Sequence, residues 1–458
     1  MVVPPPGHET QTVRIEALVA GGRGIGRVVG RVWLVEGAVP GDLVEAVPVR
    51  SRDALVEARA VRVLEPAESR RTPPCPIQGA CGGCPWMVLG EADQRSWKRR
   101  LVVDGVERIG RLVGVEVAET LPSDRDLGYR NKVEMTFGRV GPRRVLGFHP
   151  PRTVDRIVDV QSCLLQGSAG ARVLTSARGF FLEGAGRHEA ALDRSSEPTR
   201  LVIRESKATG DVLVALRGSP GPFPSAMPFA SHLASRHPEV KGVVRLLARP
   251  GRRGGTSTVS LLGDPWIEET LGGTRFRLPA AAFFQVNPGA AESLVGLVLD
   301  ATASFASPQV LDLYGGVGVF ALALARRGAR GTVVEADREA IECGRRAATE
   351  ERLGPIEFVA SDVASFLRSS HRGASPPLVV IADPPRTGFG RGVAEAIAGL
   401  GPSRIVLISC DPPTLGRDLR ALADRGYVTR RVVPVDLFPQ TAHVEAVAMV
   451  DRAGSSYD

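Results

Sequence analysis

The chain has 458 residues, of which 43% are hydrophobic and 24% charged, a composition that excludes wholesale disorder. Lysine and arginine outnumber aspartate and glutamate by 58 to 50, and the resulting net charge of +8 weakly favours a polyanionic partner. No apolar run is long enough to span a bilayer, and the first six residues lack a basic leader. We therefore expect a soluble, cytoplasmic protein of roughly three domains, with no membrane partner.

Short apolar runs separated by glycines make up residues 10–67. Runs such as 12–16 and 32–35 read as strands, and 61–64 could close a sheet before a proline. This length and pattern predict a five-stranded barrel of the oligonucleotide-binding type. Up to Arg70 the chain has nine arginines and nine acidic residues, so this region contributes nothing to the basic excess.

Four cysteines follow a proline-containing linker at residues 72–74. They are Cys75, Cys81, Cys84 and, much further along, Cys163. In a cytosolic chain such cysteines are better interpreted as ligands than as disulfides. The two glycines between Cys81 and Cys84 allow a tight turn that points two sulfurs at one centre. Four thiolates suit either Zn²⁺ or a [4Fe–4S] cluster, and the spacing alone does not separate the two.

The rest of the chain changes texture twice. A helix is expected around 91–113, and residues 129–280 alternate short β-like runs with turns, which indicates an irregular α+β domain. From about residue 308, strand-like and alanine-rich segments alternate, which predicts a parallel sheet covered by helices on both faces. Candidate strands are 309–314, 331–335, 356–360, 378–382 and 405–409, followed by 428–435 and 443–450 as an antiparallel pair.

A glycine-rich turn follows the first strand of this last region. Residues 311–320 run from a strand through Gly315, Gly316 and Gly318 into a helix, and glycines let a backbone approach a cofactor closely. Glu335 ends the next strand, 23 residues past Asp312, a spacing that suits a carboxylate on ribose hydroxyls. The turn alone is a weak signal, because nicotinamide, flavin and S-adenosylmethionine (SAM) folds all use one.

Three further segments end strands of the same predicted sheet. Asp383 begins an Asp-Pro-Pro-Arg segment, and Cys410 stands between a strand and a turn. Ligands of parallel sheets bind beyond the carboxyl ends of strands, so both side chains should face one crevice. Cysteine is a strong nucleophile at neutral pH, although a lone cysteine is more often a buried apolar residue. Residues 436–445, which join the last two strands, offer a carboxylate as a base.

Taken together, these motifs resemble the SAM-dependent RNA uracil-5-methyltransferases, across nearly the whole chain. Residues 409–415 look like the nucleophile signature of that family, and residues 435–445 look like its closing signature. Residues 284–287 match a motif whose glutamine contacts SAM, and residues 129–132 match another signature. Residues 10–67 are similar to a TRAM domain, an RNA-binding barrel, and the cysteines are similar to the [4Fe–4S] pattern of the family.

The resemblance implies a domain for each region and a role for each motif. Residues 281–458 would form a Rossmann-like class I SAM methyltransferase domain with a seven-stranded sheet, and residues 68–280 an α+β central domain with the cluster. Cys410 would be the nucleophile and Glu445 the base. SAM would be held by Gln285, Tyr314, Gly315, Gly316, Gly318, Glu335 and Asp383. The cluster would be held by Cys75, Cys81, Cys84 and Cys163. Many relatives have cysteine where this chain has Gly315, and we expect a backbone-contact position to tolerate that difference.

The implied reaction is transfer of a methyl group from SAM to C5 of a uridine in RNA. An iron–sulfur TRAM protein of this kind favours 23S ribosomal RNA, with tRNA as the alternative, and no protein partner is inferred. A radical-SAM tRNA-modifying enzyme would also combine TRAM and iron–sulfur features, but its cluster loop is C-x3-C-x2-C, whereas this chain has C-x5-C-x2-C. A non-catalytic RNA-binding protein would need neither Cys410 nor Glu445.

Overall fold

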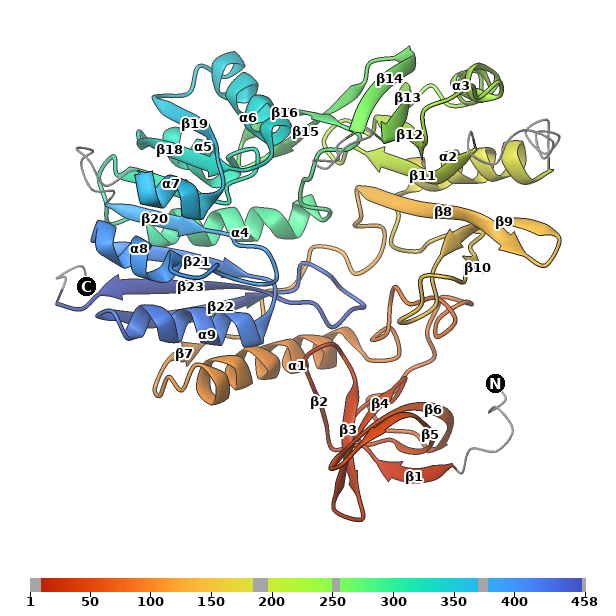
Figure 1. Cartoon of the computed structure of the whole chain (residues 1–458), viewed down its shortest axis with the longest axis horizontal. Coiled ribbons are helices and arrows are strands. Elements are labelled where there is room, and N and C mark those ends of the chain that lie inside the picture. Colours follow the sequence, from red (N-terminus) through yellow and green to blue (C-terminus); the bar gives the residue numbers. More distant parts are fainter. Residues whose placement is uncertain (1–9, 184–196, 249–255, 370–377, 455–458) are drawn as a thin grey trace.

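The computed structural model describes residues 10–183, 197–248, 256–369 and 378–454 (Figure 1). At its N-terminus a six-stranded sheet has the order β1-β5-β6-β4-β3-β2. Its strands are β1 (Gln11–Arg14), β2 (Ala17–Leu18), β3 (Gly24–Val28), β4 (Arg31–Glu36), β5 (Leu43–Arg52) and β6 (Leu55–Glu65). The expected count of five is wrong, because the two-residue strand β2 follows the first apolar run and pairs with β3, whereas β1 pairs with β5. Apolar side chains such as Val13 and Trp33 fill the interior of the sheet.

A helical segment then leads from the N-terminal sheet to the C-terminal sheet. Helix α1 (Glu91–Asp104) continues as a single π-helical stretch, η1 (Gly105–Ile109), and ends before the predicted residue 113. The π-helical stretch packs against helix α9 (Pro412–Ala423) at very short range, since a Cβ added to Gly416 would lie 1.9 Å from the Gly105 carbonyl oxygen. The short strand β7 (Glu116–Val117) follows and pairs with the C-terminal sheet.

The central region is a seven-stranded sheet in the order β10-β9-β8-β11-β12-β13-β14. Its strands are β8 (Lys132–Val140), β9 (Arg143–Phe148), β10 (Val158–Asp159), β11 (Pro198–Glu205), β12 (Val212–Gly218), β13 (Val240–Ala248) and β14 (Thr256–Gly263). Its helical elements are α2 (Ser168–Arg178), η2 (Gly179–Glu183) and α3 (Ala226–Ala234), and the hairpin β15 (Trp266–Leu271) and β16 (Thr274–Pro279) leads onward. The region therefore mixes helices and strands, as expected.

The C-terminal region is an α/β sheet in the order β19-β18-β17-β20-β21-β23-β22-β7. Its own strands are β17 (Gln309–Leu313), β18 (Arg330–Glu335), β19 (Ile356–Ala360), β20 (Val379–Ala382), β21 (Arg404–Ser409), β22 (Tyr427–Val435) and β23 (Glu445–Arg452). Its helices are α4 (Pro288–Ala301), α5 (Val319–Ala325), α6 (Arg338–Glu350), α7 (Val363–Ser369), α8 (Val393–Leu400) and α9. Residues 281–458 contribute seven strands to this sheet, and β7, from outside that range, pairs with its edge as the eighth.

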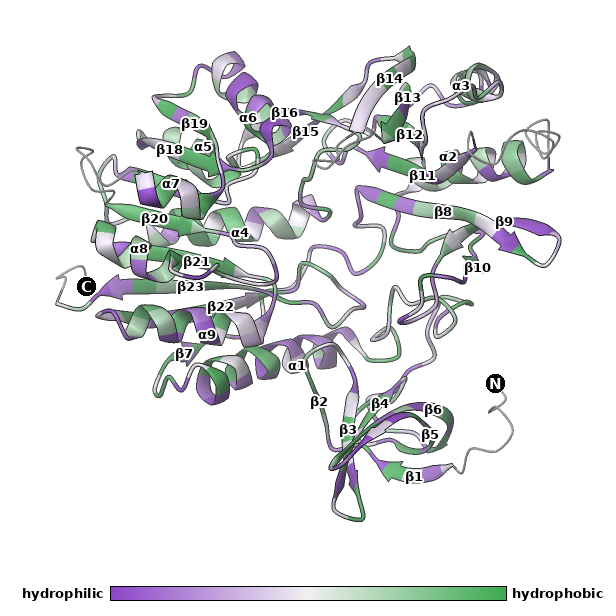
Figure 2. Cartoon of the chain, viewed as in Figure 1, coloured by the Kyte–Doolittle hydropathy of each residue, from purple (hydrophilic) through white to green (hydrophobic). Residues whose placement is uncertain are grey.

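Helices cover both faces of this sheet, and the strand sequences reflect it. Val379 and Ile381 of β20 pack into one apolar core and Val380 and Ala382 into another, so the strand is apolar on both sides. Figure 2 shows the same strands coloured as hydrophobic along most of their length, whereas the surrounding helices are mixed. No helix within the described residues is long and apolar enough to cross a membrane.

Candidate active site

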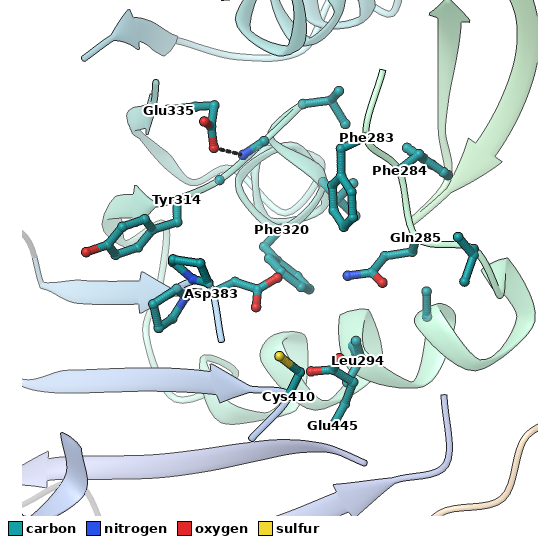
Figure 3. Close-up of a pocket in the computed structure, with 18 of the residues that line it drawn as sticks. Phe283, Phe284, Gln285, Leu294, Tyr314, Phe320, Glu335, Asp383, Cys410 and Glu445 are labelled. Atoms are coloured by element: carbon teal, nitrogen blue, oxygen red, sulfur yellow. Dashed lines mark hydrogen bonds between the residues drawn. The ribbon is translucent and has the colours of Figure 1, made fainter. Parts of the chain in front are cut away.

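A pocket of about 770 Å³ opens at the carboxyl ends of the parallel strands (Figure 3). The residues predicted from the sequence that line it are Gln285, Tyr314, Gly315, Gly316, Glu335, Asp383, Cys410 and Glu445. Gly318 does not line it but caps helix α5, with φ of 80°. Because the ends of neighbouring strands meet at one edge of the sheet, residues far apart in sequence converge here.

The glycine-rich turn forms one wall of the pocket and is held by its own domain. Tyr314, Gly316 and Gly318 have φ of 59°, 56° and 80°, so the chain passes through the left-handed region three times before α5 begins. The Gly316 N–H donates to a carboxylate oxygen of Glu335 at 3.2 Å, and the Asp337 N–H donates to the other oxygen at 2.8 Å. Glu335 therefore fixes the turn as well as facing the pocket.

Gly315, where many relatives have cysteine, has little space around it for a side chain. A Cβ added there would lie 2.8 Å from Val333 Cγ1 and 2.9 Å from the carboxyl carbon of Asp312. Glycine therefore suits this position in this chain, because Val333 and Asp312 occupy the space that a side chain would need. That the turn binds SAM with glycine in place of the relatives' cysteine stays a prediction. The turn itself keeps its place over the end of the sheet, since the Gly315 N–H donates to the Val334 carbonyl at 3.2 Å.

Gln285 reaches the pocket from a segment that the central region holds in place. The side chain of Asn131 donates to the Gln285 carbonyl at 3.0 Å, and its backbone N–H donates to the Val286 carbonyl at 2.8 Å. Asn287 then caps helix α4 by accepting from the Ala290 N–H at 3.3 Å. The sequence motif at 129–132 thus includes a residue that orients Gln285, a role that sequence reasoning did not assign.

Cys410, Glu445 and Asp383 form the opposite wall. They follow or begin the adjacent strands β21, β23 and β20, and Figure 3 shows their side chains directed toward one space, with the Gln285 amide across it. Glu445 is 6% exposed, whereas Cys410 and Asp383 are half-buried. Burial raises the pKa of both Glu445 and Asp383 well above that of an ordinary carboxyl. The Asp383 charge raises the pKa of Glu445 further, and the Glu335 charge raises that of Asp383.

Cys410 stands directly before helix α9. Asp411 caps that helix by accepting from the Thr414 N–H at 3.1 Å. Burial, and next the nearby Glu445 charge, raise the pKa of the Cys410 thiol to about 11, while the Arg386 guanidinium acts in the opposite direction. The thiol is therefore protonated at rest, and a cation and a helix N-terminus lie beside it to favour the thiolate.

Two pocket residues were missed by sequence reasoning. Arg386 donates to the ring of His443, with distances of 2.6 Å to Nδ1 and 3.0 Å to Nε2. Burial, and then the Arg386 charge, lower the pKa of His443 to about 4, so its ring is neutral and can accept this bond. Arg386 is three residues after Asp383 and His443 two before Glu445, and this closeness to predicted site residues was the one sign of their role in the sequence.

The four predicted cysteines line a separate cavity of about 380 Å³. All four are half-buried, and Arg130 and Lys132 lie at its wall. Burial, followed by the proximity of the other sulfurs, raises the pKa of Cys84 to about 12. Within the described part of the chain, no group of three or more histidine, cysteine or acidic side chains converges closely enough to hold a single metal ion.

Comparison with known proteins defines the class. Residues 377–453 match the family described as tRNA (Uracil-5-)-methyltransferase, residues 290–385 the methyltransferase small domain, and residues 8–59 the TRAM domain. A crystal structure of the Pyrococcus abyssi tRNA (uracil-54, C5)-methyltransferase with S-adenosyl-L-homocysteine has a TM-score of 0.72 and 24% identity. It covers 96% of this chain and 100% of that one. The fold is thus that of a class I SAM-dependent methyltransferase with an N-terminal TRAM domain.

Full-length relatives then fix the family. An uncharacterized RNA methyltransferase of Nitratidesulfovibrio vulgaris is 35% identical, over 97% of this chain and 96% of its own length. One from Thermotoga maritima is 34% identical, over 96% and 99%. The chain belongs to the RNA uracil-5-methyltransferase family that carries a TRAM domain, and it is an enzyme; the alternative of a non-catalytic RNA-binding protein is therefore wrong.

Proposed function

We propose that the protein methylates C5 of a specific uridine in RNA, most favourably 23S ribosomal RNA, through a covalent bond between Cys410 and the uracil. The observation that carries this proposal is the meeting of a thiol, a buried carboxyl and the glycine-rich turn in one pocket. Uracil C5 is a weak nucleophile, so its methylation needs a group that adds to the ring and a base that later removes a proton. Cys410 and Glu445 supply these two groups.

The reaction balances with these residues, the methyl donor and solvent water. The Cys410 thiol first gives its proton to solvent, beside the Arg386 guanidinium. The Cys410 thiolate adds to C6, and the electron pair of the C5–C6 bond moves toward O4 to give an enolate. C5 of the enolate takes the methyl group that SAM supplies when bound against Gln285, Tyr314, the glycine-rich turn, Glu335 and Asp383. The Glu445 carboxylate then removes the C5 proton, the double bond re-forms and the thiolate leaves.

The charges of the pocket suit this sequence of steps. A carboxyl whose pKa burial has raised is a stronger base when it ionises, which matches the role of Glu445. Arg386 favours the thiolate before attack, because a cation lies next to the sulfur. Arg130 and Arg386 are the two arginines among the residues that line the pocket. We expect them to meet the phosphates of a uridine that has turned out of its stack.

We further propose that Cys75, Cys81, Cys84 and Cys163 hold a [4Fe–4S] cluster. Each cysteine of such a cluster binds a different iron, so the four sulfurs surround a volume rather than converge on a point. The four cysteines line one cavity, and the similarity of their spacing to the [4Fe–4S] pattern of the family favours the cluster over zinc. Protein purified without oxygen should be brown and contain about four irons; zinc without iron would refute this part of the proposal.

One experiment tests the activity and identifies the target. RNA from a strain lacking this gene is incubated with the purified protein and SAM labelled in its methyl group, and the ribosomal and transfer fractions are digested and mapped by mass. Label in 5-methyluridine at a single position of 23S RNA is the expected result. Label in tRNA would correct the target, and label at any atom other than uracil C5 would refute the reaction.

A further inference from the structure

The chain that leads to Glu445 is held in place from outside its own domain. Residues 436–444, here called the base loop, connect β22 to β23 and place Phe438 and His443 in the pocket wall. In the described structure, many of its side-chain and backbone partners come from Arg71, Trp86, helix α1 and residues 121–129. These elements lie more than 300 residues earlier in the sequence.

Helix α1 provides two of these partners from consecutive turns. Lys98 forms a buried ion pair with Asp436, the two side chains being 0% and 2% exposed, and it also donates to the Phe438 carbonyl at 3.0 Å. One turn earlier, Gln94 accepts from the Gln440 N–H at 2.8 Å and donates to the Gln440 side-chain oxygen at 3.1 Å. Gln94 is 1% exposed, so water does not substitute for these bonds.

The tip of the base loop is enclosed as tightly. The Trp86 N–H donates to the Gln440 carbonyl at 3.1 Å, and the Tyr129 hydroxyl donates to the Pro439 carbonyl at 3.1 Å. The TRAM domain also reaches this point, since the Trp86 indole donates to the Gly22 carbonyl and a Cβ on Gly22 would lie 2.7 Å from Ala442.

The conformation of the base loop depends on this support. Gln440 has φ of 71°, a backbone conformation that residues other than glycine rarely adopt and that persists only where surrounding contacts impose it. Gln94 bonds Gln440 at both its backbone and its side chain, while η1 and α9 keep helix α1 close to the segment after Cys410. Helix α1 thus connects the two reacting sides of the pocket.

We propose that Gln94 and Lys98 are positioning residues, which hold the base loop so that Glu445 reaches the C5 proton. The inference rests on the proposed function. It assigns to helix α1 a share in one step of the reaction, the resolution of the covalent intermediate, and none in SAM binding. A displacement of about 1 Å at a reacting group can lower a rate about a hundredfold, so a small movement of the loop suffices.

The test measures formation and release of the covalent complex separately. Full-length wild type, Gln94→Met and Lys98→Met are mixed with target RNA and labelled SAM, and the RNA-linked protein is followed with time on denaturing gels. We expect both variants to accumulate methylated adduct and to turn over on the order of 10- to 100-fold more slowly. Their dissociation constants for SAM should stay within about twofold of wild type, and Lys98→Arg should recover part of the rate by keeping a cation beside Asp436.

Two controls separate positioning from loss of stability. Val173→Ala, a fully buried residue of the central core, lowers the melting temperature without touching the base loop and should not accumulate adduct. In a Glu445→Gln background, Gln94→Met should change adduct lifetime no further, because both changes act on one step. Equal slowing of formation and release in Gln94→Met would overturn the positioning role alone. Absence of adduct in wild type as well would overturn the proposed reaction and this inference with it.

Discussion

The two walls of the active-site pocket are held in opposite ways. The glycine-rich turn is fixed by Glu335 and Val334, about 20 residues away on the next strand of the same sheet. The base loop is fixed by Lys98 and Gln94, which are 338 and 346 residues away from their partners. The glycine-rich turn is therefore held within the C-terminal domain, whereas the base loop, which leads to the proposed base, is held by residues from much earlier in the chain.

Cys410→Ala should have the largest effect, and it should most clearly separate methyl transfer from the binding of SAM. We expect methyl transfer to fall more than about 10³-fold, with no covalent adduct, because Cys410 is the one thiol among the residues that line the pocket. Binding of SAM and of RNA, measured by calorimetry and by gel shift, should remain near that of wild type. Turnover by this variant at the wild-type rate would exclude the covalent mechanism.

Glu445→Gln should stop the reaction one stage later. Loss of a positioned base lowers rates by about 10²- to 10⁴-fold, so the methylated adduct should persist and be visible as RNA-linked protein. The measurement is the fraction of protein that remains bound to labelled RNA after denaturation. If no adduct accumulates while turnover is lost, another group acts as the base.

Glu335→Gln should weaken the binding of SAM and leave the later steps of the reaction unchanged. A hydrogen bond to a charged group contributes about 1.5–3 kcal/mol, so affinity for SAM should fall about 10- to 100-fold. At saturating SAM, adduct formation should approach that of wild type. If adduct formation at saturating SAM fell by the same factor as the affinity for SAM, the glycine-rich turn and the base loop would not act independently.

Asp312→Asn should have the smallest effect, and it should depend on pH. Burial raises the pKa of Asp312 to about 7, so the folded protein keeps a proton between about pH 4 and 7 that the unfolded chain has lost. The free energy of unfolding of wild type therefore falls as pH rises through this window, by at most about 1.4 kcal/mol per pH unit.

Asparagine removes that slope and can still accept from the Ala321 N–H, as Asp312 does. Melting temperatures of the two proteins at pH 5 and pH 8 provide the check. The advantage of Asp312→Asn should be larger at pH 8, and a difference that does not change with pH would contradict the protonated state assigned to this buried carboxyl.

Much of the fold was predictable because its signals are local. The change to alternating strands and helices after residue 308 reflects a sheet that is apolar on both faces, and a run such as 379–382 carries this information by itself. The edge strands β2 and β7 were not expected, because they carry no such local signal. β2 and β7 have two residues each, and so short a strand has no pattern apart from the partner it pairs with.

The residues of the candidate site likewise divide into those with a local sequence signal and those without one. Motif order alone pointed to Cys410, Glu445, Asp383 and the glycine-rich turn, and their convergence follows from the rule that strand ends of a parallel sheet meet. The close packing of Val333 around Gly315 was not predictable, because no local pattern connects Val333 to that turn. Arg386 and His443 were missed because what marks them as site residues is their hydrogen bond to each other, which only the folded chain forms.

The sequence by itself determined the family, the strand–helix alternation and the residue types that the proposed chemistry requires, because each is written in adjacent residues. Only the tertiary structure decided how the base loop is held. A lysine and a glutamine on an early helix carry no signal for a loop more than 300 residues away, and the buried contacts that give them a role exist only when the chain has closed on itself.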